Sequence, residues 1–174
     1  MRYVIVSVIK GEAGIFNNNL RLEVYEKFKA KSSKLPAHFT IKSPFKCDDI
    51  SETEKVLENF CKTHDKAAYK IQGYDHFDNR VIFMKVLMSI EGQKLHDEVI
   101  DDLSIIKYIN FTKEDGKKKI FHVTISSKKI QKIYKDLWSY VTYIPCEFHC
   151  LFDNIAIFKW KNNTWLLHKE YNLS

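Results

Sequence analysis

Two short segments of the sequence combine histidine and threonine at the same spacing. Residues 38–43 read His-Phe-Thr-Ile-Lys-Ser and residues 122–127 read His-Val-Thr-Ile-Ser-Ser, so both follow the pattern His-apolar-Thr-Ile-x-Ser. An imidazole takes up or releases a proton near neutral pH, and a hydroxyl donates a hydrogen bond to an anionic oxygen. The repeated segments therefore predict acid–base chemistry at a phosphodiester.

The predicted catalytic groups are the imidazoles of His38 and His122 and the hydroxyls of Thr40 and Thr124. One imidazole takes the proton of the attacking oxygen while the other, protonated, gives a proton to the leaving oxygen. Each transfer accelerates a reaction by about 10²- to 10⁴-fold. The hydroxyls donate to the non-bridging phosphate oxygens. Because this chemistry needs no metal ion and no other cofactor, we expect neither. The sequence leaves open which histidine is the acid and which is the base.

The spacing of the motifs indicates that each lies on a β-strand with its polar side chains on one face. Residues i and i+2 of a strand project from the same face, so the apolar residues between them point into the core. The polar face is expected to carry His38, Thr40 and Lys42 in the first motif and His122, Thr124 and Ser126 in the second. If the two strands lie side by side across a pseudo-twofold axis, these groups converge on one groove.

The elements that must position the motifs follow the pattern of an α+β fold. Stretches rich in β-branched and aromatic residues predict eight strands, at residues 2–9, 37–43, 67–74, 80–88, 119–126, 143–151, 154–160 and 164–171. Apolar residues at helical spacing predict four helices between them. The order β-α-β-α-β-β-α-β-α-β-β-β favours antiparallel-rich sheets covered by helices. We expect one domain, residues 1–174, with two lobes and one motif in each.

Besides the helix that opens with the capping-box pattern Ser51-Glu52-Thr53-Glu54, two predicted helices have a recognisable start. The run Asn17-Asn18-Asn19 can cap a helix that carries Leu20 to Phe28. Ser127 precedes the clearest amphipathic stripe, which runs from Ile130 to Val141. This second helix would begin directly after the second motif, where a helix N-terminus attracts phosphate.

The composition excludes several classes of protein. With 45% hydrophobic and 14% aromatic residues the chain can fill a core, and five Gly and three Pro exclude collagen-like and linker sequences. No apolar run reaches the ~20 residues that a bilayer requires, and the first apolar stretch is too short for a secretory signal. We therefore expect a cytoplasmic protein, without membrane contact, whose four cysteines are reduced thiols.

Cys146 and Cys150, with His149 beside them, raise the question of a zinc site. Their spacing is C-x-x-x-C, and no second pair of ligands stands nearby. We interpret both cysteines as small apolar residues on a strand and expect no metal site.

Positive charge is concentrated around the second motif. The chain holds 28 basic and 22 acidic residues, a net charge of +6. Residues 113–135 contain eight lysines against Glu114 and Asp115, which accounts for the whole excess. A solvated helix face is an alternative explanation of such a run. These lysines lie on both sides of His122 in the sequence, which favours a phosphate-bearing substrate over long, non-specifically bound DNA.

The two motifs, with Pro36 ahead of the first and Ser43-Pro44-Phe45 after it, resemble those of the 2H phosphoesterase superfamily and its 2′-5′ RNA ligase (LigT-like) branch. The resemblance implies a bilobal α+β fold with pseudo-twofold symmetry. It also implies a central groove with His38 and His122 as catalytic histidines and Thr40 and Thr124 as their hydroxyl partners.

The usual reaction in this superfamily is the metal-independent opening of a cyclic phosphodiester, commonly a 2′,3′-cyclic phosphate of an RNA end or a nucleotide. Some members join tRNA halves through a 2′-5′ linkage. This chain departs from the common pattern at Ala37, which separates Pro36 from His38, and at Ile41 and Ile125, where leucine is common. All three substitutions suit a strand, so we expect the chemistry to be intact.

Residues that bind the rest of the substrate are less clearly marked. Aromatic rings stack on nucleobases, and guanidinium and ammonium groups attract phosphate. The candidates are Lys42, Ser126, Phe45, Tyr74 and Arg80, with Phe77 as a further aromatic residue at a strand end.

We expect a cyclic phosphodiesterase whose partner is an RNA end or a nucleotide with a cyclic phosphate. Two alternatives are 2′-5′ ligation of RNA ends and an RNA-binding module without turnover. Intact pairing of both motifs favours an enzyme, because a pure binder does not require it. We expect a monomer with no obligate protein partner.

Overall fold

Eight β-strands form two four-stranded antiparallel sheets in the computed structural model, which describes residues 1–174. The strands are β1 (Arg2–Val8), β2 (His38–Lys46), β3 (Ala67–Phe77), β4 (Val81–Met88), β5 (His122–Ser126), β6 (Glu147–Phe152), β7 (Asn154–Lys161) and β8 (Thr164–Asn172). The first sheet has the order β2-β1-β7-β8 and the second the order β5-β4-β3-β6. The predicted α+β fold with antiparallel sheets is confirmed, and so are all eight predicted strands.

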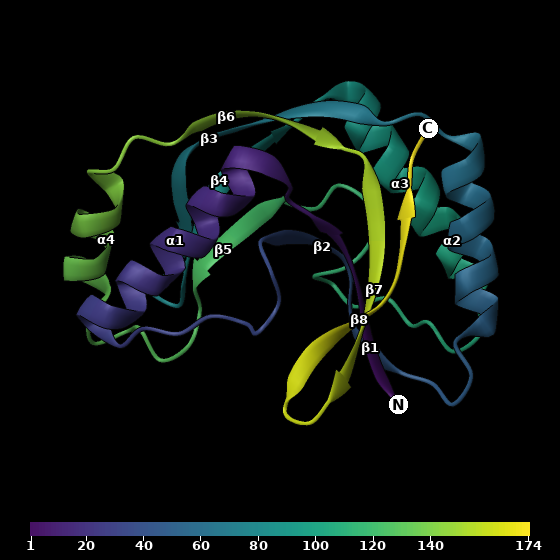
Figure 1. The fold of residues 1–174 in the computed structure, drawn as a ribbon, viewed down its shortest axis with the longest axis horizontal. Coiled ribbons are helices and arrows are strands. Elements are labelled where there is room, and N and C mark those ends of the chain that lie inside the picture. Colours follow the sequence, from purple (N-terminus) through teal and green to yellow (C-terminus); the bar gives the residue numbers. More distant parts are fainter.

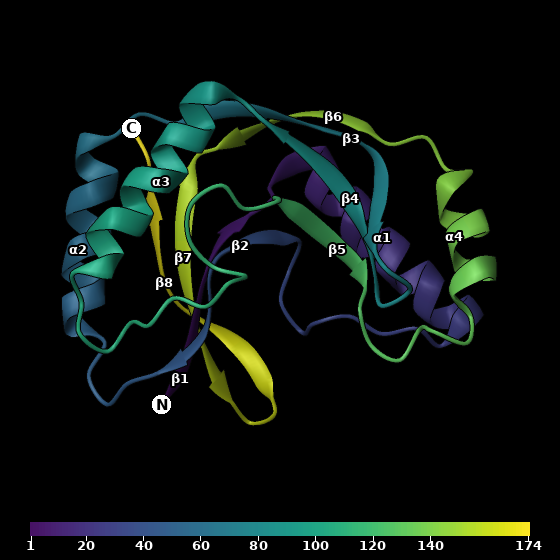
Figure 2. The same ribbon diagram turned by 180° about the vertical axis from the view of Figure 1, so that it is seen from behind.

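Both motif strands lie at sheet edges. β2 is an edge of the first sheet and β5 is an edge of the second, and each begins at its motif histidine. The two edge strands contact each other across the middle of the molecule, where Figures 1 and 2 show them between the two groups of helices. This contact brings together segments that are far apart in the sequence.

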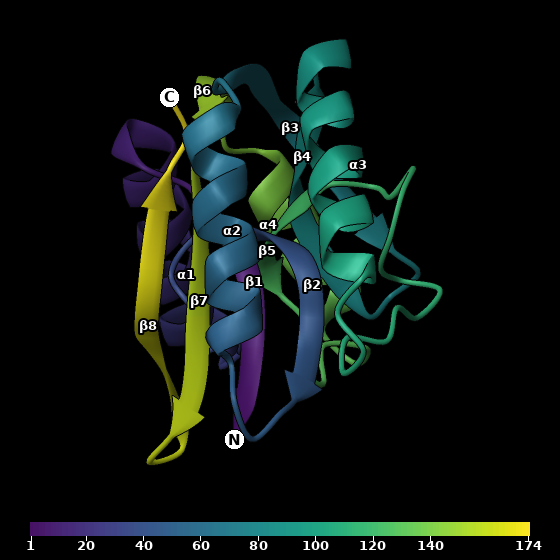
Figure 3. The same cartoon turned by 90° about the vertical axis from the view of Figure 1, so that its right-hand side faces the viewer.

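Four helices cover the outer faces of the sheets: α1 (Gly11–Phe28), α2 (Ser51–Thr63), α3 (Ile90–Ser104) and α4 (Tyr134–Thr142). α1 follows the first strand of the first sheet but packs against β5 and β6 of the second. α2 packs against β7 and β8, over the first sheet in Figure 3, and against α3, which also contacts β3. No helix combines the length and the apolarity needed to cross a bilayer.

The two sheets share one large core. Its buried residues come from strands of both sheets and from all four helices. A smaller cluster on the other face of the first sheet consists of Val4, Val6, Leu35, Ala156 and Phe158. Because the main core is common to both halves, the relative position of β2 and β5 is set by packing.

Two helix boundaries differ from the sequence prediction. α1 begins at Gly11, so Asn17 lies inside the helix, where it is fully buried and donates to the carbonyl oxygen of Thr124 (3.2 Å). α4 begins only at Tyr134. The amides of Ser127 and Lys128 instead donate to the carbonyl of Lys31, which holds this segment out of a helix.

Candidate active site

The first motif occupies the start of β2. His38 and Thr40 are half-buried, whereas Phe39 and Ile41 are buried in the core, as strand alternation requires. Ring nitrogen Nδ1 of His38 lies 2.7 Å from the carbonyl oxygen of Pro36. This contact with the preceding turn fixes the orientation of the imidazole.

The second motif occupies β5 in the same way. His122 and Thr124 are half-buried between buried neighbours, and Nδ1 of His122 lies 3.1 Å from the carbonyl oxygen of Ile120. A carbonyl oxygen only accepts, so Nδ1 carries the proton in both histidines. Nε2 is then the nitrogen that exchanges a proton in each ring.

The core beneath the motifs holds the two strands together. Phe39 follows His38 and Phe121 precedes His122, and these two phenyl rings pack edge to face with centroids 5.4 Å apart. Edge-to-face contact is a favoured arrangement of aromatic pairs. The two catalytic candidates are therefore anchored on one aromatic contact between the halves of the chain.

Burial lowers the pKa of both histidines. The pKa of His38 falls from 6.5 to about 4 because burial penalises the imidazolium, and the charges of Arg21, His122 and Lys119 add to this effect. Burial, with a further contribution from Lys119, also lowers the pKa of His122. Both histidines are neutral near pH 7, and a bound phosphate anion would raise both pKa values.

The backbone carbonyl of each motif threonine accepts a hydrogen bond from another segment of the chain. The carbonyl of Thr40 accepts a hydrogen bond from Nζ of Lys119 at 2.6 Å, and that of Thr124 accepts one from the Asn17 amide. Both threonines are half-buried, and we expect their hydroxyls to be available to a ligand.

Lys119 is a site residue that the sequence did not single out. Its half-buried ammonium bridges from the segment before β5 to Thr40 on β2. Burial lowers its pKa to about 8, although the charge of Asp115 acts in the opposite direction. The residue stood within the lysine run, but nothing in its spacing distinguished it from its exposed neighbours.

A β-bulge follows the threonine in both motifs. Ile5 and Val6 are adjacent on β1, yet they pair with Lys42 and Thr40, so β2 carries one extra residue. On β5, Ser126 and Thr124 likewise pair with the adjacent Ile82 and Phe83 of β4. Bulges redirect the side chains that follow them. The alternation predicted from the sequence therefore ends after the threonine in each motif.

Lys42 and Ser126 are turned into the protein by these bulges, which corrects the expectation that they share the groove face. Lys42 is 1% exposed and pairs with Asp115 at 2.7 Å. Ser126 is fully buried and donates to the carbonyl of Lys31 at 2.9 Å. Both side chains are occupied by contacts within the protein.

The other candidates for substrate binding are distributed differently. Phe45 is a buried core residue stacked on Tyr108, and the hydroxyl of Tyr74 is buried. Arg80 is exposed in the turn between β3 and β4 and pairs with Asp78 at 3.1 Å. Phe77, just before this turn, packs edge to face on the His122 ring at 5.1 Å. Of these candidates only Phe77 contacts a motif histidine, on a ring that Phe83 of the core also contacts, and the role of Phe77 in stacking stays a prediction.

The lysine run does not act as one patch. Lys117 pairs with Asp101 at 2.7 Å, Lys119 donates to the carbonyl of Thr40, and Lys128 lies beside the loop that precedes β2. Because α4 begins at Tyr134, its N-terminus does not adjoin the second motif, contrary to expectation. No group of three or more His, Cys, Asp or Glu side chains is placed to hold a metal ion.

Comparisons with known proteins agree with this architecture. Solved structures similar over 99% of this chain include TT0787 of Thermus thermophilus, with 12% identity, TM-score 0.68 and 98% of that chain covered. E. coli LigT complexed with NADP+ shows 10% identity, TM-score 0.64 and 97% coverage of its own chain. A comparison with curated proteins gives no significant match.

At these identities the structures show a shared fold. The family follows from the sequence, because residues 16–164 match the family model of the 2′-5′ RNA ligase superfamily. The match spans both His-x-Thr motifs. The chain therefore belongs to the 2′-5′ RNA ligase superfamily.

Proposed function

We propose that this protein hydrolyses a 2′,3′-cyclic phosphodiester, at an RNA end or on a nucleotide, by metal-independent acid–base catalysis with two histidines. The observation that carries the proposal is the pairing of His38 and His122 on the contacting edge strands β2 and β5. In both, the Nδ1 contact with a carbonyl leaves Nε2 to exchange protons.

The reaction consists of one displacement at phosphorus. A water oxygen attacks the phosphorus atom and gives its proton to Nε2 of one neutral imidazole. As the new P–O bond forms, one P–O bond of the ring breaks, and the other imidazole, protonated at Nε2, gives its proton to the leaving sugar oxygen. The products are a phosphomonoester and a free hydroxyl. The two histidines exchange protonation states, and solvent restores them.

Three further groups stabilise the charge that develops on phosphate. The hydroxyls of Thr40 and Thr124 donate to the non-bridging oxygens, and the Lys119 ammonium provides a positive field between the two strands. Because the site is half-buried, these interactions are stronger than they would be in bulk water.

The test is hydrolysis of a 2′,3′-cyclic nucleotide and of an RNA that ends in a cyclic phosphate, both in EDTA. We expect His38→Ala and His122→Ala each to lower turnover by about 10²-fold or more. The matched control is His149→Ala, since His149 is exposed on β6, at the edge of the sheet opposite β5. A single variant with full activity would remove that histidine from the mechanism, and loss of activity on chelation would contradict metal independence.

The same assay separates the alternatives. RNA ends joined through a 2′-5′ linkage would identify a ligase, and tight RNA binding with no covalent product would identify a binding module. Product analysis of the hydrolysis also shows which sugar oxygen leaves, and hence how the substrate lies between the two histidines.

A further inference from the structure

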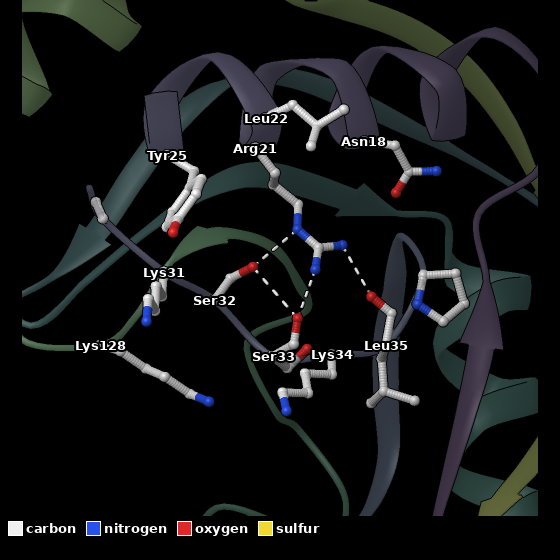
Figure 4. A pocket seen from close by; sticks show the side chains of 12 residues that line it. Asn18, Arg21, Leu22, Tyr25, Lys31, Ser32, Ser33, Lys34, Leu35 and Lys128 are labelled. Carbon is white, nitrogen blue, oxygen red and sulfur yellow. Dashed lines mark hydrogen bonds between the residues drawn. The ribbon is translucent and has the colours of Figure 1, made fainter. Parts of the chain in front are cut away.

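A pocket of about 550 Å³ lies beside the first motif, at the loop that precedes β2. It is lined by α1, by residues 30–36 of this loop and by Lys128 (Figure 4). Pro36 belongs to both sites, because it lines the pocket and its carbonyl contacts Nδ1 of His38. A ligand that fills the pocket would therefore reach the edge of the groove.

The pocket is built where the two motif strands are tied together. The carbonyl of Lys31 accepts hydrogen bonds from Oγ of Ser126 (2.9 Å) and from the amides of Ser127 (3.0 Å) and Lys128 (3.1 Å). The loop that leads into the first motif is thus bonded to the end of the strand that carries the second. The wall of the pocket and the end of β5 are therefore held together by these hydrogen bonds.

The lining is strongly basic. It contains Arg21, Lys31, Lys34 and Lys128 and no acidic residue. Arg21 serves the loop itself, with hydrogen bonds to Ser32 Oγ (2.8 Å) and to the carbonyls of Ser33 (2.6 Å) and Leu35 (2.9 Å). The lysine side chains gather on the side of the pocket opposite α1, as Figure 4 shows. A preformed concave site with positive charge and no counter-charge attracts an anion.

The opposite wall offers apolar and aromatic surface. Tyr25 is 44% exposed and Leu22 is 61% exposed, although both are large side chains on α1. The ammonium of Lys31 lies 5.9 Å from the centre of the Tyr25 ring, so a single nucleotide can contact both the ammonium and the ring. The combination of a stacking face with a cationic edge is how proteins bind single-stranded nucleic acid.

We infer that this pocket binds the nucleotide next to the cyclic end of an RNA substrate, with its phosphate against Lys31 and Lys128 and its base against Tyr25 and Leu22. The inference rests on the proposed function for the reaction and narrows its substrate class. The preferred substrate is an oligonucleotide end rather than a mononucleotide.

The experiment compares a 2′,3′-cyclic mononucleotide with a trinucleotide that ends in the same cyclic nucleotide. In the variant Lys31→Gln/Lys128→Gln, the ratio of kcat/KM for the trinucleotide to kcat/KM for the mononucleotide should fall about tenfold or more. The slope of log kcat/KM for the trinucleotide against log salt should flatten by about 0.7, because the contacts to one phosphate of a single strand are lost. Tyr25→Ala should lower the ratio about tenfold, while Tyr25→Phe, which keeps the ring, should not.

Lys55→Gln/Lys66→Gln is the matched control, since Lys55 on α2 and Lys66 between α2 and β3 are both exposed and the variant removes the same two charges. Equal losses on both substrates, or an unchanged ratio, would overturn the inference. If neither substrate turns over, the proposed function fails, and the pocket is then tested by the fluorescence anisotropy of a labelled trinucleotide with a 3′-phosphate. Binding weakened about tenfold in the double variant would support the pocket, and equal binding would reject it. Unchanged thermal melting of the variants verifies their folding.

Discussion

The ion pair between Lys42 and Asp115 gives the sharpest prediction about stability. Nζ of Lys42 lies 2.7 Å from Oδ2 of Asp115, and the two side chains are 2% and 1% exposed. The carboxylate also accepts from the amide (2.8 Å) and the hydroxyl (2.7 Å) of Ser43. Asp115→Asn keeps the shape of the side chain and removes its charge, which leaves the Lys42 ammonium buried without a counter-ion.

The size of the effect follows from the contacts. Burial alone would raise the pKa of Asp115, but the hydrogen bonds from Lys42 and Ser43 lower it from 3.8 to about 2. This difference corresponds to about 2 kcal/mol in favour of the ionised folded state. Because the variant also leaves a buried charge unpaired, we expect a loss of about 3–5 kcal/mol in the free energy of unfolding. For a chain of this size, that is a fall in Tm of roughly 6–20 °C.

Urea unfolding, followed by circular dichroism at pH 7, measures the loss. The contribution of Asp115 is fully present above pH 3.8 and is lost as the pH falls towards about 2, so the variant should show a flatter pH dependence in that range. Asp78→Asn is the matched control, because Asp78 is 77% exposed and its pair with Arg80 is at the surface. A loss for Asp115→Asn no larger than that of the control would refute this account of the pair.

Three predictions concern catalysis. Because burial lowers the pKa of both histidines, the bell-shaped pH profile of kcat/KM should centre below pH 6.5. The pH profile of kcat should centre at a higher pH, since the bound phosphate favours the imidazolium. Coincident profiles of kcat and kcat/KM would contradict this prediction. Burial is the main cause of these low pKa values, and the nearby Lys119 ammonium lowers both pKa values further. Lys119→Met should therefore move the alkaline limb of the kcat/KM profile to higher pH, whereas Lys119→Arg should keep it in place. Thr40→Val and Thr124→Val should each lower kcat by about 10²-fold, whereas Thr40→Ser and Thr124→Ser should retain most of the activity. Equal activity of the Val and Ser variants would exclude a role for the hydroxyls.

The strands and the core of the motifs could be predicted from the sequence because both depend on local patterns. β-Branched and aromatic runs mark all eight strands, and alternation placed Phe39 and Ile41 in the core. The catalytic assignment of His38 and His122 rests on the same alternation together with the repeat. The structure adds the carbonyl contact that orients each ring.

What the sequence could not predict depends on contacts between distant segments. The bulges after Thr40 and Thr124 arise from pairing with β1 and β4, and they turn Lys42 and Ser126 inwards. The start of α1 was missed because Asn17 is polar yet buried, bonded to a strand far along the chain. Lys119 becomes a site residue only because its loop is fixed against β2. Amphipathic spacing after Ser127 predicted too long a helix, since the bonds to Lys31 compete with it.

The order of the strands has a consequence for synthesis on the ribosome. β1 is an inner strand of its sheet, and its neighbour β7 follows every strand of the other sheet in the sequence. A nascent chain that has just emerged with both histidines therefore still exposes the hydrogen-bonding edge of β1, where Val4 later pairs with Phe158. Such an edge can pair with other chains until it is covered. We expect the emerging protein to depend on protection by chaperones until β7 and β8 have been added, and its two-histidine site to be assembled only then.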